Sequence, residues 1–142
     1  MNKNIWIVVI LGLVIIVLLG ILVFLPVKHT TPQAVSGIEV ISPKVNEEIS
    51  SPIKITGVVN GEGWAGFEGQ VGTVKLMDYK GNQIATGVLL ATTDWTNSQV
   101  SFATTLTFQS KTIGPMNLIF INENPSGDPV RDKVFNLPVK IK

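Results

Sequence analysis

Two carboxylates beside an aromatic residue are the side chains whose types and spacing could best support chemistry. Glu62 and Glu68 flank Trp64 in a segment with five glycines from Gly61 to Gly72. Two carboxylates beside an exposed aromatic could in principle catalyse the cleavage of a glycosidic bond. Catalytic carboxylates need rigid placement, however, and so many glycines predict a mobile loop. We therefore do not expect an enzyme.

The same loop could bind a ligand or a partner. Trp64 has only small neighbours, and an exposed Trp is common in sugar-stacking and hot-spot positions, although a Trp in a β-sandwich is more often partly buried. The candidate contact residues are Trp64, Glu68 and Trp95. The alternative is structural: Phe67 inserts into the edge of the fold, and Glu68 accepts hydrogen bonds from backbone N–H groups.

Metal and cofactor sites are not expected. Segment 122–132 is rich in oxygen ligands of the kind calcium prefers, but its order does not match an EF-hand. Its two prolines and Gly127 favour a turn, with the side chains as Asx-turn acceptors. The chain has no cysteine, and its one histidine, His29, precedes the folded part, so a thiolate site, a histidine site or a Ser-His-Asp triad is not predicted.

The element that decides the location of the chain is the segment 5–25. Its 21 residues carry no charged or polar side chain. As a helix it would reach roughly 32 Å, enough to span a bilayer core. It is longer than the core of a cleaved signal peptide and is followed by no good cleavage site, so we predict an uncleaved anchor, with late cleavage as the alternative.

The predicted organisation is a short cytoplasmic N-terminus (1–4), a transmembrane helix (5–25), a linker (26–36) and one domain (37–142). Lys3 and the α-amino group precede the span, which favours a domain outside the cytoplasm. Eleven Lys and Arg residues stand against ten Asp and Glu without a basic patch, so nucleic acid is not an expected partner. The expected partners are the lipid bilayer, through 5–25, and an envelope protein or the cell wall.

The domain has the alternation of strands and the turn residues of an all-β fold. Seven strands are predicted, at 38–42, 53–57, 74–77, 84–91, 102–108, 116–121 and 135–141. Residues 78–82 predict a hairpin with Gly81 at a positive φ, and Pro138 predicts an edge or a bulge in the last strand. This spacing fits an immunoglobulin-like β-sandwich. The expected core includes Ile55, Val74, Leu76, Phe102, Leu106, Phe120 and Leu137.

Several short motifs, in order along the domain, resemble a known family. They are Ile41-Ser42-Pro43, Ser51-Pro52, Gly57, Phe67-Glu68, Leu76-x-Asp78-x-x-Gly81, Trp95, Asn124-Pro125-Ser126-Gly127, Asp132 and Pro138-Val139. They are similar to the immunoglobulin-like domain of bacterial spore germination. The resemblance implies a β-sandwich of the bacterial envelope without enzymatic activity, whose motif residues are structural. The expected function is a non-catalytic interaction or structural module, and the alternative is a carbohydrate- or peptidoglycan-binding module that uses loop aromatics.

Overall fold

The described part of the chain folds as strands joined by short turns. The computed structural model describes residues 37–109 and 114–142. Eight strands follow one another: β1 (Ile38–Ser42), β2 (Glu48–Ile49), β3 (Ile53–Val59), β4 (Gln70–Asp78), β5 (Gln83–Ala91), β6 (Val100–Leu106), β7 (Gly114–Asn122) and β8 (Val134–Ile141). A single 3₁₀ turn, η1 (Pro129–Arg131), precedes β8.

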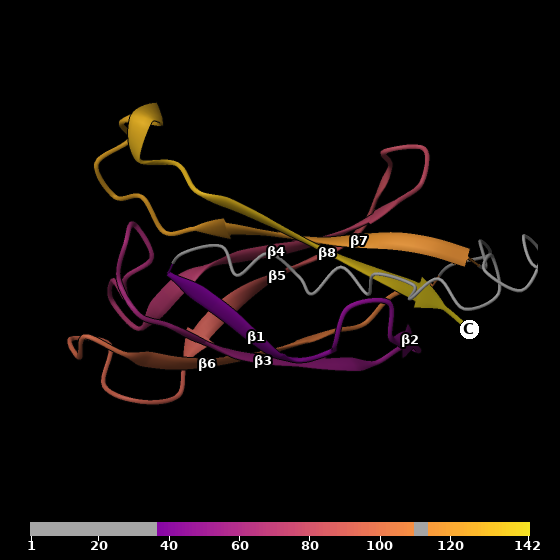
Figure 1. Ribbon diagram of the computed structural model, residues 1–142, viewed down its shortest axis with the longest axis horizontal. Helices are drawn as coiled ribbons and strands as arrows, with labels where there is room; N and C mark the ends of the chain where they lie inside the picture. The colour runs from indigo at the N-terminus through magenta and orange to yellow at the C-terminus, as the bar shows by residue number, and fades with distance from the viewer. Residues whose placement is uncertain (1–36, 110–113) are drawn as a thin grey trace, which may run out of the picture. The chain divides into compact units, whose positions relative to one another are not determined.

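The strands form two layers that face each other across one core (Figure 1). Strands β1, β3 and β6 make one layer, and β5, β4, β7 and β8 make the other, in the continuous order β1-β3-β6-β5-β4-β7-β8-β2. All pairs are antiparallel except the short β2–β8 pair. The all-β, immunoglobulin-like fold expected from the sequence is confirmed for these residues.

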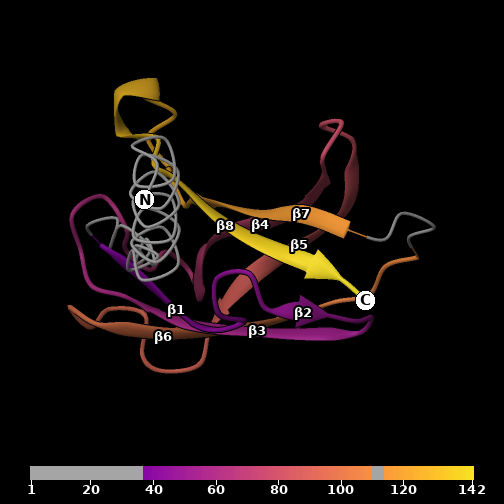
Figure 2. The same ribbon diagram turned by 45° about the vertical axis from the view of Figure 1, so that its right-hand side comes forward.

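The two layers are joined along both sides. On one side β5 meets β6 only at its end, where Leu90 pairs with Ala103 and Ala91 with Phe102; Figure 2 shows β5 descending from its hairpin with β4 towards this meeting. On the other side the chain passes from β1, paired with β3, to β2, paired with the end of β8. The sandwich is therefore nearly closed, apart from the part of β5 that precedes its contact with β6.

The core lies between the layers and follows the period-two pattern of the strands. Along β8, for example, every second residue is buried. Such alternation sends apolar side chains to one face of each strand. All seven expected core residues are at most 3% exposed, so that prediction is confirmed: Ile55, Val74, Leu76, Phe102, Leu106, Phe120 and Leu137.

Details of the strands differ from the expectation: β4, for example, begins at Gln70 rather than at residue 74. The eighth strand, β2, was not predicted, because its two residues are too few to show alternation. The predicted strand 102–108 is shifted to Val100–Leu106, and buried Phe108 follows it with its N–H bonded to Ser51 Oγ at 2.8 Å. Pro138 lies where β8 has a strand partner on one side alone, since β2 pairs only with the last two residues of β8; on the other side the Pro138 carbonyl accepts the N–H of Asn46 at 2.7 Å.

The predicted hairpin at 78–82 is present, with Gly81 at φ +84°. The Asp78 carboxylate accepts hydrogen bonds from the N–H groups of Lys80 and Asn82, each at 2.8 Å, and from Asn82 Nδ2 at 2.9 Å. These donors, the Asn82 side chain first, lower the pKa of Asp78. One carboxylate thus holds the whole turn.

The predicted transmembrane helix at 5–25 lies outside the described residues. Within residues 37–109 and 114–142, no helix has the length and apolar character needed to cross a membrane.

Candidate binding surface at one end of the sandwich

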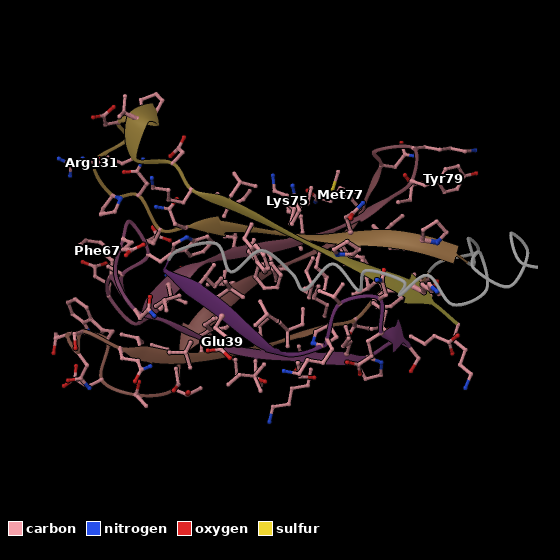
Figure 3. All side chains as sticks on the ribbon, in the orientation of Figure 1. Glu39, Phe67, Lys75, Met77, Tyr79 and Arg131 are labelled. Atoms are coloured by element: carbon pink, nitrogen blue, oxygen red, sulfur yellow. The ribbon has the colours of Figure 1, made fainter. Side chains whose placement is uncertain are left out.

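Three loops meet at one end of the sandwich: 61–69, 93–98 and 123–133. We call them together the end surface. Figure 3 shows Phe67 and Arg131 at this end and Tyr79 at the opposite end. Gly37 also lies here, because its carbonyl accepts the N–H of Asn60 at 2.9 Å. The chain therefore enters the domain beside the end surface.

The glycine-rich loop is built from two tight turns rather than the open, mobile loop that the sequence suggested. Glu62 and Gly63 have φ of +52° and +91° between the bridged residues Gly61 and Trp64. The second turn repeats this arrangement: φ is +50° at Glu68 and +83° at Gly69. Positive φ at both central residues is the requirement of type I′ turns. Each glutamate is thus a turn residue, and both are exposed.

Trp64 does not stand exposed, so its predicted role as a contact residue is wrong. Its side chain is 0% exposed and closes the core at this end. A Cβ added at Gly37 would lie 2.8 Å from Trp64 Cδ1, so the glycine lets the indole pack directly on the backbone. Among the described residues, its Nε1 has no hydrogen-bond partner. Burial of the large ring, not binding, explains this Trp.

Phe67 and Glu68 also differ from the expectation. Phe67 does not insert into the sandwich; it is 39% exposed and packs edge-to-face on Trp95, with ring centroids 6.4 Å apart. Within the described part of the chain, no backbone N–H donates to the Glu68 carboxylate, which lies at the turn tip. The loop is anchored by Trp64 instead, because the first turn directs that ring inward.

Trp95 is the one predicted contact aromatic that is partly exposed, at 39%. Gly66 packs beneath it, since a Cβ there would lie 2.6 Å from the Trp95 carbonyl oxygen. The preceding Asp94 holds the loop: its Oδ1 accepts the N–H of Thr96 at 2.9 Å and the Thr96 hydroxyl at 2.8 Å. These bonds lower the pKa of Asp94. Trp95 is therefore presented by an ordered turn.

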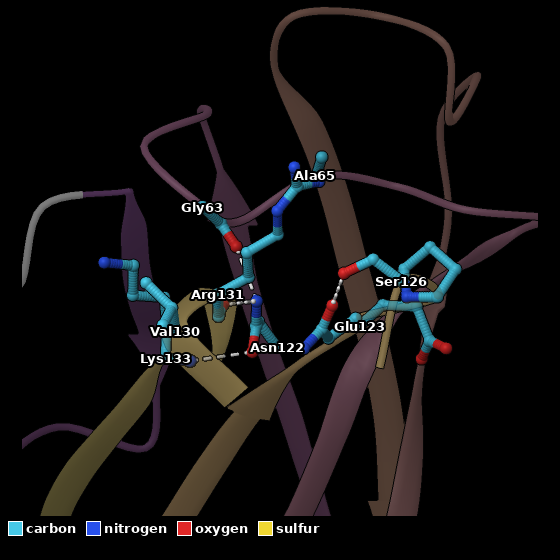
Figure 4. Close-up of a pocket in the computed structure, with 10 residues that line it drawn as sticks. Gly63, Ala65, Asn122, Glu123, Ser126, Val130, Arg131 and Lys133 are labelled. Carbon is cyan, nitrogen blue, oxygen red and sulfur yellow. Dashed lines mark hydrogen bonds between the residues drawn. The ribbon is translucent and has the colours of Figure 1, made fainter. Parts of the chain in front are cut away.

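Beside this aromatic pair lies a groove of about 320 Å³, drawn in Figure 4. Asn122, 8% exposed, forms its floor at the end of β7. Asn122 Nδ2 donates to the carbonyls of Gly63 (2.7 Å) and Arg131 (3.0 Å), and its Oδ1 accepts the N–H of Lys133 (2.8 Å). One buried amide thus fastens two loops together and fixes the groove walls.

The loop over the groove is held by turn chemistry. Asn124 Nδ2 donates to the Asp128 carbonyl at 2.9 Å and to Asp132 Oδ1 at 2.7 Å. Asp128 Oδ1 accepts the N–H of Val130 at 3.1 Å and caps η1. The Asx-turn interpretation of 122–132 is confirmed. Across residues 37–109 and 114–142, no group of three His, Asp or Glu side chains could hold a metal ion.

Charge is unevenly distributed over the end surface. Its loops carry six carboxylates, against the two cations Arg131 and Lys133; the carboxylates are Glu62, Glu68, Asp94, Glu123, Asp128 and Asp132. The Lys133 stem crosses Gly63, where an added Cβ would lie 2.7 Å from Lys133 Cε. Arg131 and Lys133 line the groove together with Glu123, so both signs of charge are available within an otherwise acidic end.

Of the three predicted contact residues, the structure brings Trp95 to the partly exposed rim, leaves Glu68 at an exposed turn tip and buries Trp64. The groove and its floor, Asn122, were not predicted from the sequence. One signal existed: Asn122 is a polar residue directly after the mostly apolar strand 116–121. A buried polar residue at such a position needs hydrogen-bond partners and so points to a loop junction.

The comparisons agree with this architecture. A search of curated proteins finds no match to the chain. A family model, immunoglobulin-like domain of bacterial spore germination, matches residues 37–128. The match extends from the first residue before β1 to the loop over the groove, and β8, which follows it, completes the sheet by pairing with β7. This chain belongs to the family of immunoglobulin-like domains of bacterial spore germination.

Proposed function

We propose that this chain is a non-catalytic interaction module of the bacterial envelope, tethered to the membrane by residues 5–25 and binding a protein partner through the end surface. Immunoglobulin-like domains of this kind are typically non-catalytic, and residues 37–109 and 114–142 contain neither His nor Cys. The observation that carries the proposal is the exposed Phe67–Trp95 pair beside the groove, on turns fixed by hydrogen bonds. Partly exposed aromatics on a rigid support are typical hot-spot residues.

The position of Gly37 supports a partner close to the bilayer. The chain enters the domain at the end surface, and only residues 26–36 separate it from the predicted span. Fully extended, that linker reaches at most about 40 Å. On this proposal the partner is therefore a membrane protein or a domain held near the membrane.

The charge of the end surface supports a protein with basic side chains. Six carboxylates against two cations leave a net charge of −4 on its loops (2 − 6). Complementary charge speeds encounter and excludes partners of the same sign. Anionic wall polymers are therefore disfavoured, and binding should weaken as salt screens the carboxylates.

A pull-down with the full chain in detergent micelles tests this function. Trp95→Ala should lose the partner that wild type retains, and Tyr79→Ala, an exposed aromatic at the opposite end, should keep it. Equal recovery by both variants would contradict the end surface as the binding site.

Peptidoglycan binding is the second candidate, and the exposed ring of Trp95 favours it, since sugars stack on such rings. A titration with peptidoglycan fragments, followed by Trp fluorescence, separates the two. A saturable change in the fluorescence of the wild-type protein, reduced in Trp95→Phe, would support sugar binding. Fluorescence that does not change when the fragments are added would support the protein partner.

A further inference from the structure

Strand β5 has an open edge along most of its length. It pairs with β4 along the strand on one side, but with β6 only at Leu90 and Ala91. From Gln83 to Leu89 no described residue pairs with its second side. Backbone N–H and C=O groups on such an edge are a template for another extended chain. The chemistry that fits this edge is therefore a polypeptide in the strand conformation.

Beyond the register shift near its start, opposite Leu76/Met77, strand β5 lacks the usual protection of an edge strand. Segment 83–93 contains no charged residue and no proline. The other edges differ: β1 carries the exposed Glu39, β8 carries Pro138, and β2 has only two residues. Natural edges are blunted by charges, prolines, bulges or shortness. An unprotected edge of this length is expected to be covered in the native assembly.

The outward face beside this edge is apolar as well. Val88 and Leu90 are 39% and 53% exposed, and Thr86 lies on the same face. Below the strand, Gly87 packs against β6, since an added Cβ would lie 2.6 Å from Leu106 Cδ2. A chain added beside β5 would thus cover apolar side chains on one face and continue the sheet.

We propose that the occupant is a second copy of this chain, paired antiparallel through β5 and centred on Gly87. Gly87 is the middle of Ala85–Leu89, the regular stretch between the register shift opposite Leu76/Met77 and the contact with β6. In such an antiparallel pair, a residue a given number of positions before Gly87 in one copy lies opposite the residue the same number of positions after Gly87 in the other copy. Thr86 of one copy then lies opposite Val88 of the other, and the same contact occurs twice.

Charge complementarity favours this occupant and this direction. Lys80, in the hairpin before β5, and Asp94, in the loop after it, are each seven positions from Gly87. Antiparallel pairing brings Lys80 of one copy towards Asp94 of the other at both ends of the paired β5 strands. A parallel arrangement would set like charges side by side. Between these ends the strand is uncharged, so self-pairing meets no repulsion.

Disulfide cross-linking tests the pairing directly, because the chain has no native cysteine. Thr86→Cys and Val88→Cys are made in the full chain, purified in detergent micelles and oxidised separately and as an equal mixture. Residues opposite one another in a ladder are close enough for a disulfide. The mixture is expected to give several-fold more covalent dimer than either variant alone.

The control pair is Asn117→Cys mixed with Val88→Cys. Asn117 is exposed but lies on the inner strand β7, so this mixture measures random collision and dimers held by other parts of the chain. Cross-linking of the β5 mixture no higher than this control would overturn the proposal. In addition, Lys80→Glu should lower the dimer yield more than Lys80→Gln does, because it replaces attraction to Asp94 by repulsion. Equal yields from these two variants would refute the antiparallel arrangement.

Discussion

Asn122 and Gly63 lie 59 residues apart in the chain and are joined by a hydrogen bond of 2.7 Å from Asn122 Nδ2 to the Gly63 carbonyl. This bond connects the end of β7 to the first of the two tight turns. Because the same amide also holds the carbonyl of Arg131 and the N–H of Lys133, the groove walls depend on one side chain.

Replacing Asn122 by Ala should therefore destabilise the fold. The change leaves backbone groups of Gly63, Arg131 and Lys133 without their partner, and an unpaired buried group costs about 1–3 kcal/mol. We expect a loss of at least that size in the free energy of unfolding, measured by urea denaturation. Asn117→Ala, on the exposed face of the same strand, should change it by less than about 0.5 kcal/mol. Equal effects would show that the Asn122 bonds do not hold the loops.

The two Trp residues of the domain should behave oppositely. Trp64→Ala removes a fully buried ring and should cost about 3–5 kcal/mol of stability. Trp95→Ala, at the partly exposed rim, should cost about 1 kcal/mol or less. Thermal melts of both variants measure the difference. A Trp64 variant that melts like wild type would mean that the indole does not close the core.

Glu68 is predicted to be a turn residue without a stabilising carboxylate. Asn tolerates positive φ better than Glu, and Asn-Gly is the preferred type I′ pair. Glu68→Asn should keep or slightly raise the melting temperature, whereas Glu68→Val should lower stability by about 1 kcal/mol or more, because a β-branched residue resists this backbone. A large loss with Asn would restore a structural role for the carboxylate.

Stability should fall at acid pH through Asp78. Its pKa in the folded state is lowered from 3.8, so the unfolded chain binds the proton first as pH falls. The contribution of Asp78 is therefore present above about pH 4 and is lost as pH falls through the lower, folded-state value. Melting temperatures from pH 2 to 7 should drop less steeply for Asp78→Asn than for wild type. Parallel curves would exclude this carboxylate as a source of the acid loss.

The prediction that residues 5–25 form an uncleaved membrane anchor can be tested by mass measurement. Residues 5–25 are expected to remain attached, since the apolar run is long and no good cleavage site follows it. The mass of the protein extracted from membranes should correspond to the whole chain. A product that begins near Val35 would show that the segment is a cleaved leader.

The strands could be predicted from the sequence, but the end surface could be predicted only in part. The alternation of apolar and polar residues in the strands that carry Phe102, Leu106 and Leu137 indicates which side chains are buried, because each strand contributes one face to the core. No such period exists in the turns. Trp64 enters the core against Gly37, a residue far away in sequence whose missing Cβ leaves room for the indole. The pairs Glu62-Gly63 and Glu68-Gly69 were a usable sign of type I′ turns, whereas the groove required the contact between Asn122 and Gly63.

The most direct test of the central claim, that the end surface binds a partner, is photo-crosslinking in the living cell. A photoreactive phenylalanine analogue replaces Trp95 in one full-length variant and Tyr79, at the opposite end, in another. Position 95 should give a discrete adduct with one envelope protein, and an added Glu123→Lys change in the groove should weaken it, because it reduces the negative charge that attracts a basic partner. Position 79 should give no such adduct. Adducts of equal yield from both positions, or none from position 95, would contradict the account.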